Sequence, residues 1–332
     1  MINKQPKVAY LVICWNNRDI IDECLHALKE QTYESTDIYV IDNASKDGSA
    51  DYIEEKYPEI HFVRHNENSG FAKGNNILIK EVLKDKDVEY IALINSDAML
   101  DKHWTSEVVD FLKDKSMVAG AQGITLDYYN HSIVDAEHIY VGTNFHAVQY
   151  GYGMRYKKAY AHPRKVFGVN AAAAVYSRSF IEQQHDKKLF DEKFYIYLED
   201  VDVSFRAIMT GWNSYYIPAA RAYHMGSVSS KKRSNGFNIE MTFRNNAALL
   251  FKNMPLKVFL IHLPEAAKME LQYYRHMYKR FGFVAMLRVV RARLVGILRL
   301  PLYISDRRRI TKQRKISNTT LDRVMRRKGI FG

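Results

Sequence analysis

The first hundred residues alternate short apolar runs with segments whose apolar positions recur every three or four residues. The apolar runs at 7–14, 38–41, 60–64 and 90–94 are rich in Val, Ile, Leu and Tyr, which is typical of buried strands. The segments between them, at 19–30, 49–57 and 71–83, are predicted to form helices. Because strand and helix alternate, we expect an α/β fold built on a parallel sheet with right-handed crossovers.

Each of these four strands ends in polar residues. The ends carry Asn16 and Asn17, Asp42 and Asn43, Asn66 and Asn68, and Asn95 with Ser96 and Asp97. One polar turn means little, but four on the same edge of a sheet predict a polar crevice, where open α/β sheets bind ligands. The first strand–helix turn lacks G-x-G-x-x-G and the chain has no P-loop, which argues against a dinucleotide-binding Rossmann domain.

The fourth strand stops abruptly at Asn95, Ser96 and Asp97. A lone carboxylate at such a strand end can hold a hard divalent cation, and the cation can hold a diphosphate. Asp97 would otherwise satisfy backbone N–H groups at the start of a helix. The strand end alone leaves both interpretations open.

The middle of the chain is less regular. We predict a strand at 118–124, whereas the stretch at 131–153 is rich in Tyr, His and Gly and supports no assignment. A further strand at 166–176 is interrupted by four alanines at 171–174. Small side chains there would either let a ligand approach or let a helix pack closely.

An aromatic and apolar run at 194–198 leads into three carboxylates, Glu199, Asp200 and Asp202. If a helix starts near Glu199, Asp202 and Arg206 lie at i and i+4 and can pair. Asp200 would then lie in the first turn, either as an acid that favours the helix start or as a general base.

The segment after this helix carries an isolated histidine. We expect the helix to end at 211–212 and a strand at 215–217 to stop at Pro218. His224 follows, and such a histidine serves either as a buried structural residue or as a ligand.

Taken in order, these motifs resemble the family 2 glycosyltransferases with the GT-A fold, most closely the bacterial rhamnosyltransferase type. The resemblance covers about residues 7–230. It rests on Trp15-Asn16-Asn17, DNASKDGS at 42–49, NSGFAKGNN at 68–76, NSD at 95–97, EDVD at 199–202 and HMGS at 224–227. It implies a mixed, mostly parallel sheet flanked by helices.

The resemblance also implies roles for individual residues. Asp97 and His224 would hold Mg²⁺ or Mn²⁺, and Asp200, with Glu199 beside it, would be the catalytic base that takes a proton from the acceptor. The donor and substrate side would include Asn16, Asp42, Asn43, Asn68, Gly70, Gly74, Asn76, Asn95, Ser96 and Trp212. Two positions depart from the family pattern: Asn95 replaces the first carboxylate of Asp-x-Asp, and the alanine run begins where relatives have a glycine.

The resemblance therefore predicts an inverting glycosyltransferase that uses a nucleoside-diphosphate sugar. dTDP-rhamnose is one candidate donor, and the acceptor would be a glycan or a lipid-linked glycan in cell-surface polysaccharide synthesis. The alternative is a catalytically silent protein of the same fold that binds nucleotide sugars or glycans. The loss of a charge at Asn95 keeps this alternative open.

The net charge of +12 is concentrated in the tail. Residues 266–332 hold 18 Lys and Arg against 3 Asp and Glu, whereas the rest holds 31 against 34. We therefore divide the chain into a GT-A domain, 1–230, and a basic helical extension, 231–332. In the extension Leu287, Val290, Leu294, Ile297 and Leu298 share one helical face. Basic amphipathic helices suit an anionic membrane surface; packing on the body and RNA binding are the alternatives, and no RNA-binding motif supports the last.

Cysteine usage and hydropathy suggest a compartment. Cys14 and Cys24 fall in no metal or redox spacing, so we expect reduced core residues. The apolar run at the N-terminus is too short for a signal peptide, and no stretch approaches the ~20 apolar residues of a membrane span. We expect a cytoplasmic protein, peripheral on the inner face of the cell membrane, with no nucleic-acid partner.

Overall fold

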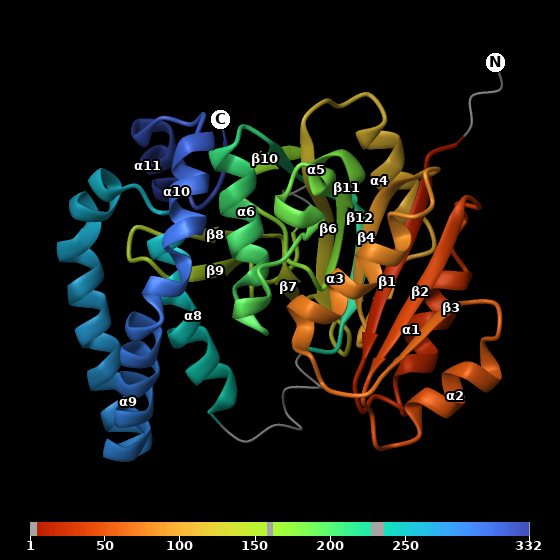
Figure 1. The fold of residues 1–332 in the computed structure, drawn as a ribbon, viewed down its shortest axis with the longest axis horizontal. Coiled ribbons are helices and arrows are strands. Elements are labelled where there is room, and N and C mark those ends of the chain that lie inside the picture. Colours follow the sequence, from red (N-terminus) through yellow and green to blue (C-terminus); the bar gives the residue numbers. More distant parts are fainter. Residues whose placement is uncertain (1–4, 158–161, 227–235, 332) are drawn as a thin grey trace.

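A mixed β-sheet forms the centre of the molecule (Figure 1), in a computed structural model that describes residues 5–157, 162–226 and 236–331. Its main strands lie in the order β10-β12-β6-β11-β4-β1-β2-β3, with β5 added to β12 and β7 to β6. The strands are β1 Lys7–Cys14, β2 Thr36–Asn43, β3 His61–His65, β4 Val88–Asn95, β5 Ala98–Leu100, β6 Val118–Asp127, β7 Val134–Ala136, β10 Arg164–Val166, β11 Ala173–Ser177 and β12 Asn213–His224. A separate hairpin pairs β8 His138–Val141 with β9 Ala147–Tyr150.

The first half of the sheet is parallel, as the alternating pattern predicts. β1 pairs in parallel with β2 and β4, and β2 with β3. Their carboxyl ends therefore share one edge, which brings the four polar strand ends together. β11 joins antiparallel between β4 and β6 and makes the sheet mixed. The expected mixed, mostly parallel sheet is confirmed.

Helices cover both faces of the sheet because side chains alternate along each buried strand. Val8, Tyr10 and Val12 of β1 belong to the core beneath α1, α2 and α4, whereas Ala9 and Leu11 belong to the core beneath α3, α5 and α6. These helices are α1 Ile21–Lys29, α2 Ser49–Lys56, α3 Gly70–Val82, α4 Trp104–Leu112, α5 Arg178–Glu182 and α6 Glu199–Met209. Cys14 and Cys24 are buried and free, as expected.

Two strand predictions are wrong. Residues 166–176 do not form one strand: β10 ends at Val166 and pairs with β12, and β11 starts only at Ala173, so Ala171 and Ala172 lie in the connection. β12 does not stop at Pro218 but continues to His224. Its pairing with β6 shifts register between Ile217 and Arg221, and such a break in the ladder tolerates the missing N–H of proline.

The C-terminal helices pack against the end of the sheet that carries α6. They are α8 Phe237–Asn253, α9 Leu256–Leu298, α10 Ile304–Gln313 and α11 Asn318–Arg326. Side chains of α8, α10 and α11 share one core with α6 and β8. α9 bends at Gly282 (φ +83°), and its two arms stand side by side at the edge of the molecule (Figure 1). The predicted domain boundary at residue 230 falls outside the described residues.

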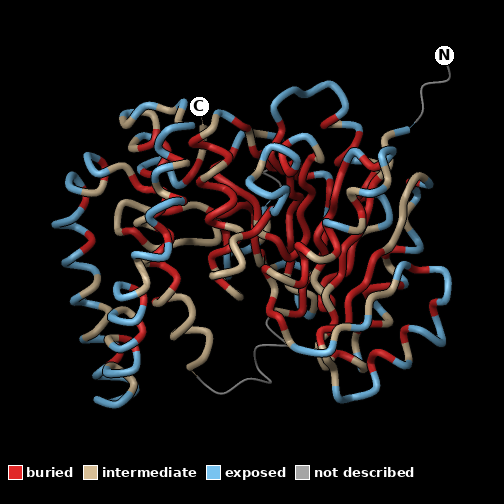
Figure 2. The backbone as a smooth tube through the Cα atoms, in the orientation of Figure 1, coloured by how far each residue is buried: buried red, intermediate tan, exposed pale blue. Residues whose placement is uncertain are grey.

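α9 is largely exposed along its length (Figure 2). Many of its exposed side chains are large and apolar, including the predicted face members Leu287, Leu294, Ile297 and Leu298. Of the helices in the described ranges, none combines the length and the apolar content that crossing a bilayer requires.

Candidate active site

A cavity of about 390 Å³ opens where the polar strand ends meet. Its lining comes from the ends of β1, β2 and β4, the start of α3, the β8–β9 hairpin, residues 170–172, residues 196–201, and His224. Thr242 of α8 also lines it. The predicted crevice is therefore present, and the C-terminal helices contribute one residue to its lining.

Asp97 and His224 lie on one side of this cavity. Asp97 ends the loop after β4, and β5 begins at the next residue. β5 pairs antiparallel with the end of β12, with Ala98 opposite His224. This register places Asp97 Oδ1 3.2 Å from His224 Nε2, although 127 positions of chain separate them. Asn95 Nδ2 lies 3.4 Å from the same nitrogen.

The histidine is held from its other side by Asp135 of β7. Asp135 Oδ2 lies 3.0 Å from His224 Nδ1. Burial lowers the pKa of His224, but the carboxylates of Asp135 and Asp97 outweigh it and raise the pKa to about 10. The ring is therefore an imidazolium between two carboxylates, and a cation that binds at Nε2 must displace a proton.

These donors fit a divalent cation. A carboxylate and an imidazole converge on the cavity, and a carboxylate hydrogen-bonded to the far nitrogen is the usual partner of a metal-binding histidine. Within the described part of the chain, no group of three or more His, Cys, Asp or Glu side chains is arranged to hold a metal ion. A cation at this pair would complete its coordination with water and phosphate oxygens, as Mg²⁺ and Mn²⁺ readily do.

Asn43, Asn68 and Gly70 form a connected wall of the cavity. Asn43 Nδ2 donates to Asn68 Oδ1 at 3.2 Å, and Asn68 Oδ1 also accepts from the Gly70 N–H at 3.0 Å. Gly70 has φ +79°, and a Cβ there would lie 2.4 Å from the Tyr195 ring. Glycine is thus required by the protein's own packing.

Other predicted substrate residues lie at the strand ends but outside the cavity lining. Asn16 bridges two turns: its N–H donates to Ser45 Oγ at 2.8 Å, and its Oδ1 accepts from the Lys46 N–H at 2.7 Å. Asp42 is buried, and its Oδ2 accepts from the Ser45 N–H at 3.0 Å. Asp42 Oδ1 is buried and has no hydrogen-bond partner among the described residues.

Three further predictions fall on residues that pack the protein. Gly74 allows α3 to approach β1, because a Cβ would lie 3.0 Å from Ile13 Cδ1. Asn76 donates to the Phe190 carbonyl at 2.9 Å and accepts from its N–H. Trp212 packs edge-on against Phe180. Each of the three lies apart from the cavity lining.

Ser96 lines the cavity, and its hydroxyl accepts from Asn17 Nδ2 at 2.5 Å. This bond ties the end of β1 to the loop after β4. Ser227, the last member of the HMGS motif, lies outside the described residues.

Glu199 and Asp200 begin α6 at the wall of the cavity, as the sequence predicts. Asp200 is half-buried, and its Oδ1 accepts from the Val201 N–H at 2.8 Å. Burial raises the pKa of Asp200 to about 6. Burial and the neighbouring Asp200 raise the pKa of Glu199 well above its ordinary value. At neutral pH Asp200 is therefore ionised and able to accept a proton.

The predicted pair of Asp202 and Arg206 is also present, at 3.0 Å. Both residues face away from the cavity into a network with α8, described below.

Sequence reasoning missed the residues that come from the short strands β7, β8 and β9. Asp135 lies in a three-residue strand, and Ile139, Ala147, Val148 and Gln149 of the β8–β9 hairpin line the cavity. All of them belong to the stretch that supported no assignment, where short strands leave too few residues for a periodic pattern.

The known proteins to which this chain is similar include glycosyltransferases. The model of the family described as "Glycosyl transferase family 2" matches residues 10–183. A Bacillus subtilis protein named as a teichuronic acid biosynthesis glycosyltransferase, TuaG, is 29% identical over 129 residues, 38% of this chain and 50% of its own. The N-acetylglucosaminyl-diphospho-decaprenol L-rhamnosyltransferase of Mycobacterium tuberculosis is 23% identical over 221 residues, 61% of this chain and 71% of its own. The match thus spans about half the length of TuaG.

Among solved structures, the chain is similar to the mannosyltransferase PcManGT from Pyrobaculum calidifontis, a complex with GDP-Man and Mn²⁺. The TM-score is 0.53 at 16% identity, and the match covers 98% of this chain and 88% of that one. At this identity the likeness concerns the fold, which agrees with the predicted GT-A architecture.

Proposed function

The chain belongs to glycosyl transferase family 2, and from that premise we propose that it is an inverting, metal-dependent glycosyltransferase. It would move a sugar from a nucleoside-diphosphate donor to a glycan or lipid-linked acceptor in cell-surface polysaccharide synthesis. The observation that carries this proposal is the cavity that brings Asp97, His224 and Asp200 together from three distant parts of the chain.

The donor would bind with its diphosphate beside Asp97 and His224. These two side chains would hold Mg²⁺ or Mn²⁺, which supplies positive charge opposite the departing diphosphate. Asp135 keeps the imidazole oriented through its 3.0 Å contact with Nδ1. The amide side chains of Asn43 and Asn68 line the same cavity, and the unpartnered Asp42 Oδ1 would accept a hydrogen bond from the nucleotide base.

Asp200 would act as the general base. Its carboxylate takes the proton of an acceptor hydroxyl while the hydroxyl oxygen forms a bond to the anomeric carbon. The bond from that carbon to the diphosphate oxygen breaks on the opposite face, and the nucleoside diphosphate leaves with the electron pair. Attack from the opposite face inverts the anomeric configuration. A pKa of about 6 leaves Asp200 ionised at neutral pH.

dTDP-rhamnose is our first candidate donor, because a relative named as a rhamnosyltransferase matches over 61% of this chain. The name of that relative also specifies a lipid-linked acceptor, and we propose an acceptor of the same class. Asn95, in place of a carboxylate, leaves a catalytically silent sugar-nucleotide-binding protein as the competing function.

The test is donor turnover by the purified full chain with Mn²⁺ or Mg²⁺, across dTDP-rhamnose and a panel of UDP- and GDP-sugars. We expect metal-dependent release of a nucleoside diphosphate. Asp200→Asn should lower turnover by about 10²- to 10⁴-fold while donor binding survives. Binding of a donor without turnover, by a folded wild-type protein given acceptor, would favour the silent alternative.

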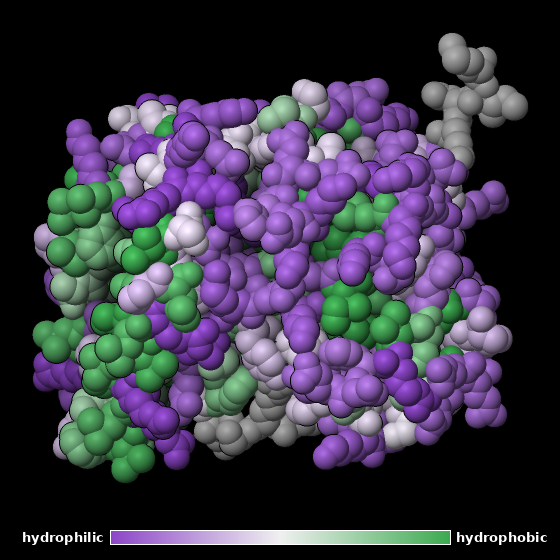
Figure 3. Space-filling model, in the orientation of Figure 1, coloured by the Kyte–Doolittle hydropathy of each residue, from purple (hydrophilic) through white to green (hydrophobic). Residues whose placement is uncertain are grey.

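We further propose that the protein lies on the inner face of the cell membrane, on an anionic surface. Its exposed apolar side chains gather on α9 (Figure 3): Leu256, Leu260, Ile261, Leu263, Met269, Leu271, Tyr278, Phe281, Phe283, Val284, Leu287, Leu294, Val295, Ile297 and Leu298. Exposed cations lie among them at Lys257, Lys268, Arg275, Lys279, Arg280, Arg288 and Arg291. Apolar and basic side chains on one exposed helix suit a surface of anionic lipid.

Vesicle flotation tests this placement. The protein should float with vesicles that contain anionic lipid and should remain below with neutral vesicles at high salt. Leu294→Gln with Leu298→Gln should weaken flotation, whereas Tyr129→Gln, at an exposed aromatic residue outside α9, should not. A protein that stays in solution with anionic vesicles at low salt contradicts the proposal.

A further inference from the structure

The loop that leads into α6 has an unusual backbone. Tyr195, Tyr197 and Leu198 have φ of +67°, +69° and +67°, in the left-handed region that side chains other than glycine rarely adopt. Residues 196–201 line the cavity directly, and Asp200 follows Leu198 by two positions. A loop in this conformation persists only where surrounding contacts impose it.

One side chain of α8 supplies several of those contacts. Asn245 Nδ2 lies 2.9 Å from the Phe194 carbonyl, 2.9 Å from that of Ile196 and 2.8 Å from that of Tyr197. Its neighbour Arg244 donates to the Phe194 carbonyl at 2.9 Å and to Asn245 Oδ1 at 3.0 Å. Asn245 is buried. The Asn245 amide therefore lies within hydrogen-bond distance of three carbonyls that the left-handed backbone of residues 194–198 turns toward it.

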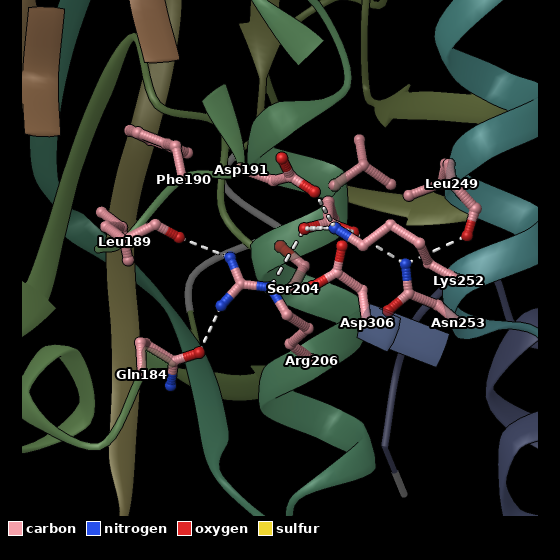
Figure 4. A network of polar contacts seen from close by, with 12 residues as sticks. Gln184, Leu189, Phe190, Asp191, Ser204, Arg206, Leu249, Lys252, Asn253 and Asp306 are labelled. Atoms are coloured by element: carbon pink, nitrogen blue, oxygen red, sulfur yellow. Dashed lines mark hydrogen bonds and ion pairs between the residues drawn. The ribbon is translucent and has the colours of Figure 1, made fainter. Parts of the chain in front are cut away.

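α8 also contacts α6 just after Asp200 in the sequence. Figure 4 shows Lys252 and Asn253 of α8 reaching toward α6, with Asp191 and Arg206 nearby. Lys252 Nζ lies 3.0 Å and Asn253 Nδ2 2.8 Å from the carboxylate of Asp202, two residues after Asp200. α8 thus binds the backbone before Asp200 and a side chain just after it.

We propose that Asn245 is a positioning residue that sets the orientation of Asp200, which makes α8 part of the catalytic apparatus. The inference rests on the proposed role of Asp200 as general base. Asn245 does not line the cavity, so it acts through the 194–198 backbone. α8 also contributes Thr242 to the cavity wall, one helical turn before Asn245.

Asn246 provides a matched control. It is the next residue on α8 and is also buried, and its side chain makes two hydrogen bonds: it donates to the Phe145 carbonyl at 2.8 Å and accepts from Arg293 at 2.7 Å. These bonds lead to the β8–β9 connection and to α9, not to the 194–198 loop. Replacing Asn246 removes two buried hydrogen bonds, against the four that the Asn245 side chain makes, and it does not release the loop.

The experiment compares Asn245→Ala, Asn246→Ala and Asp200→Asn in the full chain, with Mn²⁺ and the donor that the wild type turns over. We expect Asn245→Ala to lower kcat by about 10²-fold, the usual effect of misplacing a reacting group by about 1 Å. The donor KM should stay within about twofold, and the acidic limb of the pH–rate profile should move because the surroundings of Asp200 change. Asn246→Ala should lower the melting temperature comparably and keep kcat and the pH profile.

Two results overturn the inference: Asn245→Ala keeps kcat within twofold while Asp200→Asn is inactive, or Asn246→Ala loses kcat equally. If Asn245→Ala does not fold, Asn245→Ser, which retains one hydroxyl donor, is measured in its place against the same criteria. Failure of the proposed function appears differently, because the wild type would then bind a donor without turning it over. Turnover retained by Asp200→Asn would instead overturn the assignment of Asp200 as general base and, with it, this inference.

Discussion

Replacing Lys252 with Met should destabilise the protein strongly and in a pH-dependent way. The Lys252 side chain is 2% exposed, and its ammonium lies 2.7 Å from Asp191 Oδ2 and 3.0 Å from the Asp202 carboxylate, which is fully buried. Met preserves the length and much of the volume of the side chain. The variant therefore removes a charge from a buried network and leaves the packing nearly unchanged.

The magnitude follows from the state of Asp202. Burial raises the pKa of its carboxyl, but Lys252, then Arg206 and Asn253, outweigh burial and lower the pKa from 3.8 to about 2. One pKa unit is worth about 1.4 kcal/mol, so the net lowering of the Asp202 pKa, with burial included, stabilises the folded state by roughly 2–3 kcal/mol at neutral pH. Removing one partner of a buried pair costs about 3–5 kcal/mol. Because Arg206 remains 3.0 Å away, we expect about 3 kcal/mol.

The sign of the pH dependence provides a second check. In the wild type the folded pKa of Asp202 is depressed, so its stabilisation is present above pH ~4 and is lost only as the pH falls through about 2. In the variant, Lys252 no longer opposes the effect of burial, so the pKa of Asp202 is higher than in the wild type. The penalty is then largest at neutral pH and shrinks as Asp202 takes up a proton on acidification.

Urea unfolding at pH 7 and pH 4.5 measures both effects. Lys257→Met, at an exposed lysine of α9, is the control and should change the free energy of unfolding by less than about 0.5 kcal/mol. The reasoning is refuted if Lys252→Met unfolds at pH 7 with the free energy of the wild type, or if the difference does not narrow at pH 4.5.

Three further outcomes test the site. Asp135→Asn should weaken Mn²⁺ binding about 10- to 100-fold, measured by calorimetry with dTDP present, because the His224 ring loses its charged partner; unchanged affinity would leave Asp135 a structural role only. Since burial raises the pKa of Asp200 to about 6, turnover should be level above that pH and fall about tenfold per unit below it, and a profile flat to pH 5 would contradict the assignment. Gly70→Ala should lower the melting temperature and donor affinity together, because its Cβ would lie 2.4 Å from the Tyr195 ring; a variant with wild-type values of both would show that the loop yields freely.

The parallel half of the fold was predictable because its strands are covered on both faces. Such strands appear as continuous apolar runs, and β1, β2 and β4 do so, whereas the edge strand β3 is partly exposed. Parallel pairing then places every polar strand end on one edge, so Asn43, Asn68 and Asp97 could be grouped without coordinates. The partner of Asp97 could not be predicted from the pattern of strands. Only the family resemblance indicated His224, since the register of β5 against β12 decides that contact and β5 is three residues long.

The predictions that went wrong share a physical cause. Pro218 removes one ladder hydrogen bond, and a local rule stops the strand there, but the register shift between β12 and β6 absorbs the loss. The alanine run at 171–174 likewise has strand-like neighbours on both sides. Its first two members instead line the cavity between β10 and β11. In both places the pairing partner decided the outcome, and that partner is distant in sequence.

Asn245 shows a signal that sequence reasoning could have used. Residues 244–246 are Arg-Asn-Asn in the middle of α8, and Asn245 and Asn246 face the core. A buried amide must be hydrogen-bonded, and a helix satisfies its own backbone, so the partner is either a side chain of a neighbouring element or the backbone of an irregular segment packed against the helix. A polar residue on the buried face of a helix therefore predicts one of these two partners nearby. Here the partner is the loop that begins one residue before Tyr195 and ends two residues before Asp200, which ties the C-terminal helices to the proposed chemistry.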